Sequence, residues 1–302
     1  MSKRLVSLFL ALLLALCAAS AAAEGAAVTV TDMYGRAIEL DEPVTRIVAL
    51  TPSDCEILCA IGCEDALVGR GKYCDYPESI LDVPVVQSGA ETNIEEILAL
   101  EPQVVLMSDM SQTEEQANML EQNGVKVVIS DANDIAGTYT AIRMIGSLMG
   151  KDAEAETVIA DMQATFDEIA ANSPASGKTI YFEVTPLQWG LWTAGSATFM
   201  DELATMCGLT NAFSDIEGWA AISEEQVLER NPDYIVSIAG MGDTAVEEIM
   251  GREGWGDLNA IKNAEVYNAD SNAIARPGPR LKDAAIELYN FLNDIAEEVP
   301  AA

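Results

Sequence analysis

The chain has 302 residues, enough for two domains of ordinary size, and 50% of them are hydrophobic, which favours a packed core over disorder. Its formal net charge of -33 argues strongly against nucleic acid as a partner and disfavours an anionic membrane surface, because binding phosphates needs clustered Lys and Arg. Histidine is absent, so a serine-histidine hydrolase and a His-ligated zinc site are excluded.

Residues 1–23 have the pattern of an export signal peptide. Two cations precede an apolar run at 5–16, which is short for a transmembrane helix, and small residues lead up to Ala23. Cys17 also suggests a lipoprotein signal, although Leu16 stands where such signals have Gly, Ala or Ser. We therefore expect an exported protein of the periplasm or the outer face of the cytoplasmic membrane, cleaved after Ala23 or tethered by lipid at Cys17.

Residues 24–137 are predicted to form an N-terminal α/β lobe. Short buried strands alternate with helices that end at Gly or before Pro, a pattern typical of a parallel sheet covered by helices. Asn93 and Glu96 have the spacing of a capping box. The predicted strands are 28–32, 37–40, 46–50, 66–69, 104–107 and 125–129, and the predicted helices are 55–61, 93–101 and 113–122.

Residues 138–177 are predicted to connect two lobes through helices at 138–149 and 152–172. Apolar residues recur along the second helix at helical spacing, and Asp152 is its expected N-cap. At 1.5 Å per residue this helix spans roughly 30 Å, the width of a small domain. One alternative is an ordinary amphipathic helix on a single core; we favour a rigid strut between two lobes because the flanking segments resemble each other.

Residues 178–302 are predicted to form a C-terminal α/β lobe that repeats the first. The segments 95–106 and 225–236 both read as an acidic helix start, an apolar pair, a proline stop and a buried strand. Two such lobes joined by a rigid element leave a cleft between them, where ligands are expected. The predicted strands are 179–184 and 234–238, and the predicted helices are 198–206, 223–231 and the last one, ending near 295.

The cysteines favour a disulfide over a metal site. Cys55, Cys59 and Cys63 follow helical spacing, which places them in a row, whereas a metal cluster needs thiolates that converge on one point. In an exported protein a disulfide is the more common use of cysteine, and we predict it between Cys55 and Cys74. Cys59, Cys63 and Cys207 are expected to be buried apolar residues.

Tryptophans and arginines supply the candidate ligand contacts. Trp192 and Trp219 lie in segments whose sequence is typical of loops. Two roles remain open for them: contact with a flat ligand, or packing within the loop itself. Arg276 and Arg280 flank a stiff Pro-Gly-Pro segment, and arginine is suited to hold carboxylates, amides or phosphates, or else to pair with local acids. No nucleophile-base pair and no glycine-rich phosphate loop is found, so neither catalysis nor a cofactor is predicted.

Taken together, the chain resembles the class III substrate-binding proteins of ABC importers, the family that delivers cobalamin, iron-siderophores and haem. The resemblance covers the whole mature sequence. It implies two Rossmann-like lobes with parallel sheets, bridged by one long rigid α-helix, with a ligand bound in the cleft between the lobes and no reaction. The segments that carry it are 46–53, 73–77, 93–102, 225–228 and 276–280.

Within this family the chain is most similar to the cobalamin binders, which implies a corrinoid ligand. Two positions of the first lobe that are tryptophan in the best-known cobalamin binder are Gly89 and Ser108 here, so a ferric siderophore or haem stays open as the ligand. The positions that match ligand-contacting residues of the cobalamin binders are Tyr73, Trp192, Trp219 and Arg276.

The resemblance also implies a partner, the permease dimer of an ABC importer. Glu95 and Glu225 occupy the same place in the two repeats, and in the family these glutamates meet arginines on the two permease subunits. An acid is favoured at a helix start in any case, because of the exposed N–H groups there. We expect a monomer that binds the permease. The alternative from another class is a cell-surface interaction protein without a small ligand.

Overall fold

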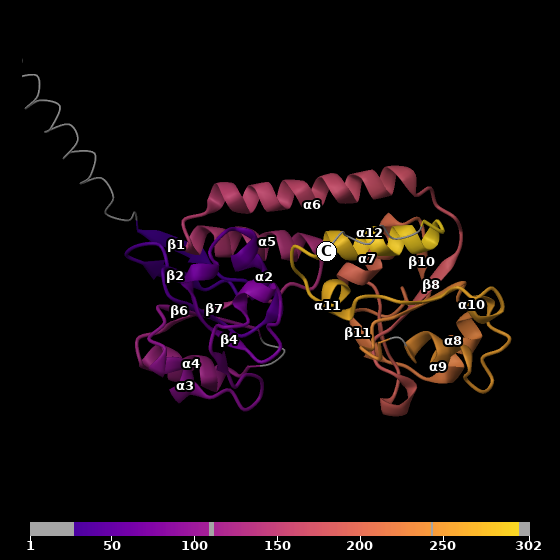
Figure 1. The fold of residues 1–302 in the computed structure, drawn as a ribbon, viewed down its shortest axis with the longest axis horizontal. Coiled ribbons are helices and arrows are strands. Elements are labelled where there is room, and N and C mark those ends of the chain that lie inside the picture. Colours follow the sequence, from indigo (N-terminus) through magenta and orange to yellow (C-terminus); the bar gives the residue numbers. More distant parts are fainter. Residues whose placement is uncertain (1–26, 109–111, 243, 296–302) are drawn as a thin grey trace, which may run out of the picture.

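The computed structural model describes residues 27–108, 112–242 and 244–295, so the predicted signal peptide and Cys17 lie outside the described residues. Two lobes lie side by side, and a long helix runs across both of them (Figure 1). Within the three described ranges no helix is long and apolar enough to span a membrane.

The N-terminal lobe is built on a five-stranded parallel sheet. Its order is β5-β4-β3-β6-β7, and an antiparallel hairpin of β1 (Val28–Thr31) and β2 (Ala37–Leu40) precedes it. The central strands are continuous apolar runs because helices cover both faces of the sheet. The strands are β3 (Ile47–Ala49), β4 (Leu67–Gly71), β5 (Val85–Val86), β6 (Val104–Met107) and β7 (Lys126–Ile129), and the helices are α2 (Pro52–Ala60), α3 (Ile94–Ala99), α4 (Glu114–Gln122) and α5 (Ile135–Leu148).

The C-terminal lobe has a four-stranded parallel sheet in the order β10-β8-β12-β13. A separate antiparallel ribbon pairs β9 (Trp192–Ala194) with β11 (Trp219–Ala221). The other strands are β8 (Thr179–Glu183), β10 (Thr210–Asn211), β12 (Tyr234–Ser237) and β13 (Val266–Asn268), and the helices are α7 (Phe199–Met206), α8 (Glu224–Arg230), α9 (Thr244–Met250), α10 (Asn259–Lys262), α11 (Ser271–Ile274) and α12 (Leu281–Leu292).

The bridging helix α6 spans Asp152–Asn172, as the sequence pattern predicts. It packs against α5 of the first lobe and α12 of the second, so the interpretation as a strut across two lobes is confirmed (Figure 1). The expected N-cap is wrong, because Lys151 is the capping residue and Asp152 is already helical. The residues that α6 buries are Ala155, Ile159, Met162, Phe166 and Ile169.

One continuous core lies beneath α6 and reaches into both lobes. Successive side chains of a strand point to opposite faces, so Ile47 of β3 joins this shared core while Val48 joins a second core with residues of α3 and α4. In the other lobe Ile180 of β8 joins the shared core, and Tyr181 joins a third core with residues of α8, α9 and α10. The shared core is the physical reason why the two lobes and α6 form one unit.

Some local predictions need correction. Helix α2 begins at Pro52, three residues before the predicted start, because proline is well suited to the first helical turn. Asn93 does cap α3 by accepting from the Glu96 N–H, but the Glu96 carboxylate accepts from the Gln87 N–H instead of completing a capping box. Trp192 and Trp219 belong to strands β9 and β11 and not to loops.

Candidate functional site

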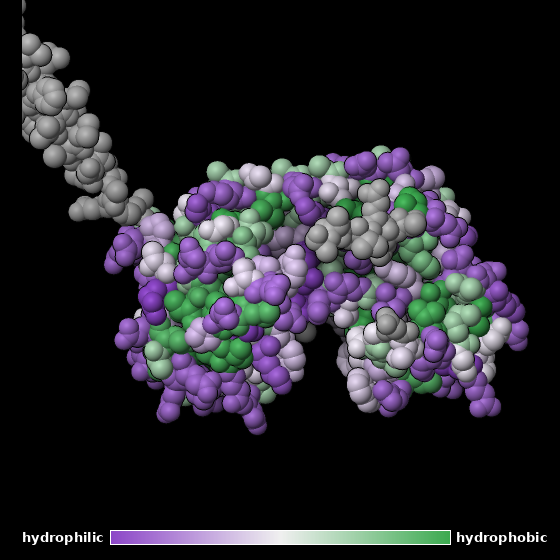
Figure 2. All heavy atoms as spheres, in the orientation of Figure 1, coloured by the Kyte–Doolittle hydropathy of each residue, from purple (hydrophilic) through white to green (hydrophobic). Residues whose placement is uncertain are grey.

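A cleft separates the two lobes on the side away from α6, and Figure 2 shows it as a deep notch. Between the lobes a cavity of about 210 Å³ is lined by Thr51, Ser53, Ser108 and Ser130 of the first lobe and by residues 275–277 of the second. The N-terminal lobe contributes these side chains at the carboxyl ends of β3, β6 and β7, the edge where parallel sheets bind ligands.

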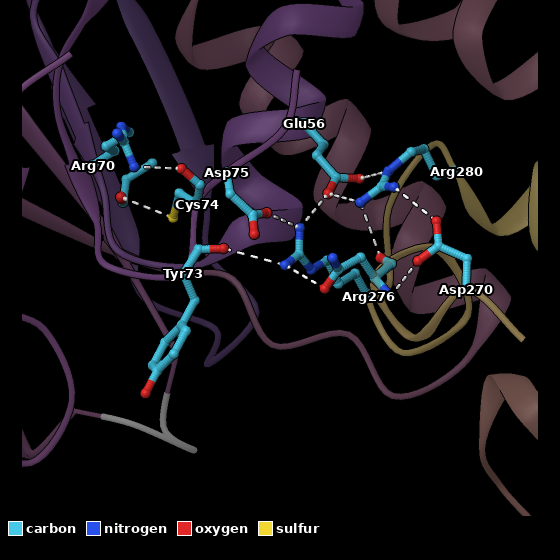
Figure 3. Close-up of polar contacts among 10 residues, drawn as sticks. Glu56, Arg70, Tyr73, Cys74, Asp75, Asp270, Arg276 and Arg280 are labelled. Atoms are coloured by element: carbon cyan, nitrogen blue, oxygen red, sulfur yellow. Dashed lines mark hydrogen bonds and ion pairs between the residues drawn. The ribbon is translucent and has the colours of Figure 1, made fainter. Parts of the chain in front are cut away.

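A cluster of ion pairs joins the lobes beside this cavity (Figure 3). Glu56 of α2, with a side chain only 2% exposed, accepts hydrogen bonds from two arginines of the other lobe. Arg280 donates to both of its oxygens, at 2.9 and 2.7 Å, and Arg276 donates to Oε1 at 3.1 Å. Arg276 also donates to Asp75 at 2.8 Å, and Arg280 lies 3.6 Å from Asp270. Both guanidinium groups are thus held by carboxylates.

The loop that carries Tyr73 is fixed by the same cluster. The Arg276 guanidinium donates to the Tyr73 carbonyl at 3.2 Å, while the Tyr73 side chain is 67% exposed and points away from the cluster (Figure 3). The ammonium of Lys72 lies 5.5 Å from the centre of the Tyr73 ring. Arg280 lies over the ring of Tyr76 at 4.0 Å. The loop therefore presents an aromatic side chain from a well-anchored backbone.

The β9–β11 ribbon positions the two predicted tryptophans. Trp219 pairs with Ala194, two residues beyond Trp192, so both tryptophans lie on the same face of the ribbon. Trp219 is half-buried and contacts Phe199, with ring centres 5.6 Å apart, whereas Trp192 is 43% exposed. Figure 1 shows β11 at the edge of its lobe that faces the other lobe.

Two further hydrogen bonds join the lobes close to the β9–β11 ribbon. The Phe199 N–H donates to the Asn133 carbonyl at 2.9 Å, and the Ile135 N–H donates to the Glu202 carboxylate at 2.7 Å. Trp219 packs on Phe199, so these contacts place the tryptophan close to the line where the lobes meet.

The predicted site residues thus fall into two groups. The Tyr73 loop and Arg276 are in direct contact, while Trp192 and Trp219 lie together on the ribbon of the second lobe. Sequence reasoning missed Glu56, which pairs with both arginines. Its signal was an acid within the apolar helical run 55–61, a residue type that is almost never buried unless it is paired.

The predicted disulfide is not formed, because the structure holds both cysteines as free thiols. Cys55 and Cys74 nevertheless lie next to each other, and each sulfur lies 3.8 Å from the Ala49 carbonyl oxygen. The hydrogen bond with Cys74, together with burial, raises the pKa of Cys55 well above its ordinary value. Among the described residues no group of three or more Cys, Asp or Glu is placed to hold a metal ion.

Asp54 is a fully buried acid in the first turn of α2. The Thr51 hydroxyl donates to its Oδ2 at 2.5 Å, and among the described residues its Oδ1 has no hydrogen-bond partner. Burial raises the pKa of Asp54 from 3.8 to about 6, and the hydroxyls of Thr51 and Ser130 oppose the rise. The negative charge of Asp131 raises the pKa further.

We predict that Asp54→Asn stabilises the protein at pH 8 but not at pH 4. Because the pKa in the folded state, about 6, exceeds the ordinary value of 3.8, the native state loses stability as pH rises from about 4 to above 6. The shift corresponds to at most roughly 3 kcal/mol, so a gain of about 1–3 kcal/mol is expected at pH 8. Urea unfolding at both pH values measures it. An equal effect at the two pH values would show that the carboxylate is not strained by burial.

Glu95 and Glu225 occupy equivalent positions in the structure. Each is the second residue of its helix, α3 or α8, and each side chain is exposed. The Ser223 hydroxyl holds the pKa of Glu225 below its ordinary value, so this group is ionised at neutral pH. Both helices lie on the side of the molecule away from α6, one on each lobe (Figure 1).

Comparisons with known proteins agree with this architecture. A family model described as periplasmic binding protein matches residues 47–273. The chain is 31% identical over 268 residues to the uncharacterized ABC transporter substrate-binding lipoprotein YvrC of Bacillus subtilis, covering 86% of this chain and 84% of that protein. It is 30% identical over 257 residues to the vitamin B12-binding protein of Salmonella choleraesuis, covering 83% of this chain and 91% of the relative.

A solved structure of similar fold is that of a possible iron-binding (periplasmic solute-binding) protein from Staphylococcus epidermidis. It superposes with a TM-score of 0.72 at 28% identity and covers 83% of this chain and 99% of that one. The family match extends over both lobes and the bridging helix. The chain therefore belongs to the periplasmic binding protein family, as a class III substrate-binding protein of ABC importers.

Proposed function

We propose that this protein captures a corrinoid in the cleft between its lobes and delivers it to the permease of an ABC importer, without catalysis. The observation that carries the proposal is the charge of the cleft. Arg276 and Arg280 are already bound to Glu56, Asp75 and Asp270. A ligand with several carboxylates would have to displace these acids, whereas the primary amides at the edge of a corrin ring need no such exchange.

The aromatic side chains support a large, flat ligand. Trp192 and Trp219 share one face of the ribbon, and Tyr73 projects from the opposite lobe on an anchored loop. Aromatic rings of this kind bury large areas of ligand with little loss of side-chain freedom. The vitamin B12-binding relative from Salmonella choleraesuis supports the same class of ligand.

A ferric siderophore or haem is the second candidate. The similar protein from Staphylococcus epidermidis is described as possibly iron-binding, and Lys72 places a cation beside Tyr73 in this chain. One exposed lysine suits a single anionic group of a ligand. The neutralised arginines are the reason for placing this candidate after the corrinoid.

Titration with cyanocobalamin, followed by tryptophan quenching and calorimetry, tests the proposal. We expect binding at micromolar concentration or tighter, and Trp192→Ala should weaken it by about tenfold or more, the effect of removing a buried aromatic anchor. Tyr34→Ala is the control, because Tyr34 is an exposed aromatic residue like Trp192 but belongs to the β1–β2 turn.

Parallel titrations with haemin and a ferric siderophore separate the candidates. Neither quenching nor heat with micromolar cyanocobalamin would refute the corrinoid proposal, and binding of an iron chelate instead would move the assignment to the second candidate. A protein that binds none of the three would point to an interaction protein without a small ligand.

A further inference from the structure

We infer that the cavity of about 210 Å³ between the lobes is a subsite for a hydrogen-bond-donating group of the ligand, such as a primary amide, and that it rejects carboxylates. The inference deepens the proposed function and rests on a ligand lying in the cleft. It assigns a chemical selectivity to Thr51, Ser108 and Asp131, beyond the aromatic and arginine contacts that the sequence pattern predicts.

The cavity is large enough for a ligand side chain. A single water needs only about 10–15 Å³ on the same measure, so the space accommodates an acetamide-sized group. Both lobes form its walls, because residues 51–53, 108 and 130–132 come from the first lobe and 275–277 from the second. A group that enters it is therefore held between the lobes.

The hydroxyls in the wall present oxygen lone pairs to the cavity. An ionised carboxylate only accepts hydrogen bonds, so a hydroxyl bonded to one must use its proton there. Thr51 donates to Asp54 at 2.5 Å, and Ser108 donates to Asp131 at 3.2 Å. With the protons of Thr51 and Ser108 directed at carboxylates, these two hydroxyls offer acceptors to the cavity and so fit N–H donors.

The charges around the cavity also favour a hydrogen-bond donor over a carboxylate. Asp131 lines the wall, and Asp54 lies directly behind Thr51. The nearest cation in the wall is Arg276, whose charge is already shared by Glu56 and Asp75. An additional carboxylate would meet like charges in a partly buried space, which is strongly unfavourable, whereas an amide N–H₂ or an ammonium would be attracted.

Fragment titrations followed by NMR test the subsite without a corrinoid. Acetamide and acetate, each at high millimolar concentration and pH 8, are added to ¹⁵N-labelled protein. We expect acetamide to shift the backbone resonances of Ser108 and Ser130, and acetate to leave them in place. Ser108→Ala, which removes one acceptor, should weaken the acetamide response. Shifts at these residues with acetate and none with acetamide would overturn the inference.

Corrinoids with one altered side chain give the second test. Mild acid hydrolysis converts single amides of cyanocobalamin to carboxylates, and at least one of these monocarboxylates should bind the wild-type protein about tenfold or more weaker than cyanocobalamin at pH 8. Asp131→Asn removes a charge from the wall at nearly constant volume. It should reduce the ratio of the dissociation constants of the monocarboxylate and cyanocobalamin at least threefold. Asp257→Asn, a change at a fully exposed acid of the other lobe, should leave the ratio unchanged.

The two experiments separate the subsite from the proposed function. If cyanocobalamin binds but no monocarboxylate is discriminated against, the subsite is wrong and the corrinoid proposal stands. If no corrinoid binds while acetamide still shifts Ser108 and Ser130, the subsite stands and the identity of the ligand changes.

Discussion

Reversal of both Glu95 and Glu225 to arginine is expected to reduce uptake by the reconstituted importer at least tenfold while leaving the affinity for the free ligand unchanged. Both glutamates are exposed at the second position of a helix, one on each lobe, and both helices lie on the side away from α6. Such a pair is suited to two equivalent cations on a two-fold symmetric permease. Charges at the rim of an interface control the encounter rate and the register of docking.

The control for this double variant must carry the same change in net charge. Asp167→Arg with Glu168→Arg serves, because both residues are exposed on α6, on the opposite side of the molecule. Arginine near a helix N-terminus costs about 0.3–1 kcal/mol per site, so the docking variant should remain folded. Uptake at the wild-type rate by the docking variant would leave these glutamates with a role in helix stability alone.

Glu56→Gln is expected to destabilise the protein by about 3 kcal/mol, close to the lower end of the range for breaking a buried ion pair. The carboxylate is 2% exposed and holds two arginines whose side chains are each 12% exposed. Asp75 and Asp270 still face these arginines in the variant, which is why the upper end of the range is not expected. Urea unfolding at pH 7.5 measures the loss.

The same variant should also loosen the orientation of the lobes. Glu56 belongs to the first lobe and both arginines to the second, so small-angle scattering is expected to show a broader distribution of interatomic distances. Glu168→Gln, at an exposed position of α6, is the control and should change neither property. If Glu56→Gln unfolds at the wild-type urea concentration, the cluster does not stabilise the contact between the lobes.

The resemblance drawn from the sequence identified residues of the cleft but not their state. Arg276 was expected to bind the edge of the ligand, and its contact with the Tyr73 loop does place it between the lobes. Its guanidinium, however, is bound to Glu56 and Asp75, which precede it by 220 and 201 residues. Ion pairs between residues so far apart in the chain produce no local sequence pattern, so the sequence did not show that these charges are neutralised.

By itself, the sequence determined the bounds of α6, the repeated unit of helix, proline stop and strand, and the division into two α/β lobes. These features depend on hydrophobic periodicity and on proline and glycine, which act within a few residues. Only the tertiary structure decided that Cys55 and Cys74 are free thiols and that buried Asp54 lies behind a cavity lined by hydroxyls. Burial and proximity arise when distant segments pack together, and they set the charge state of each group.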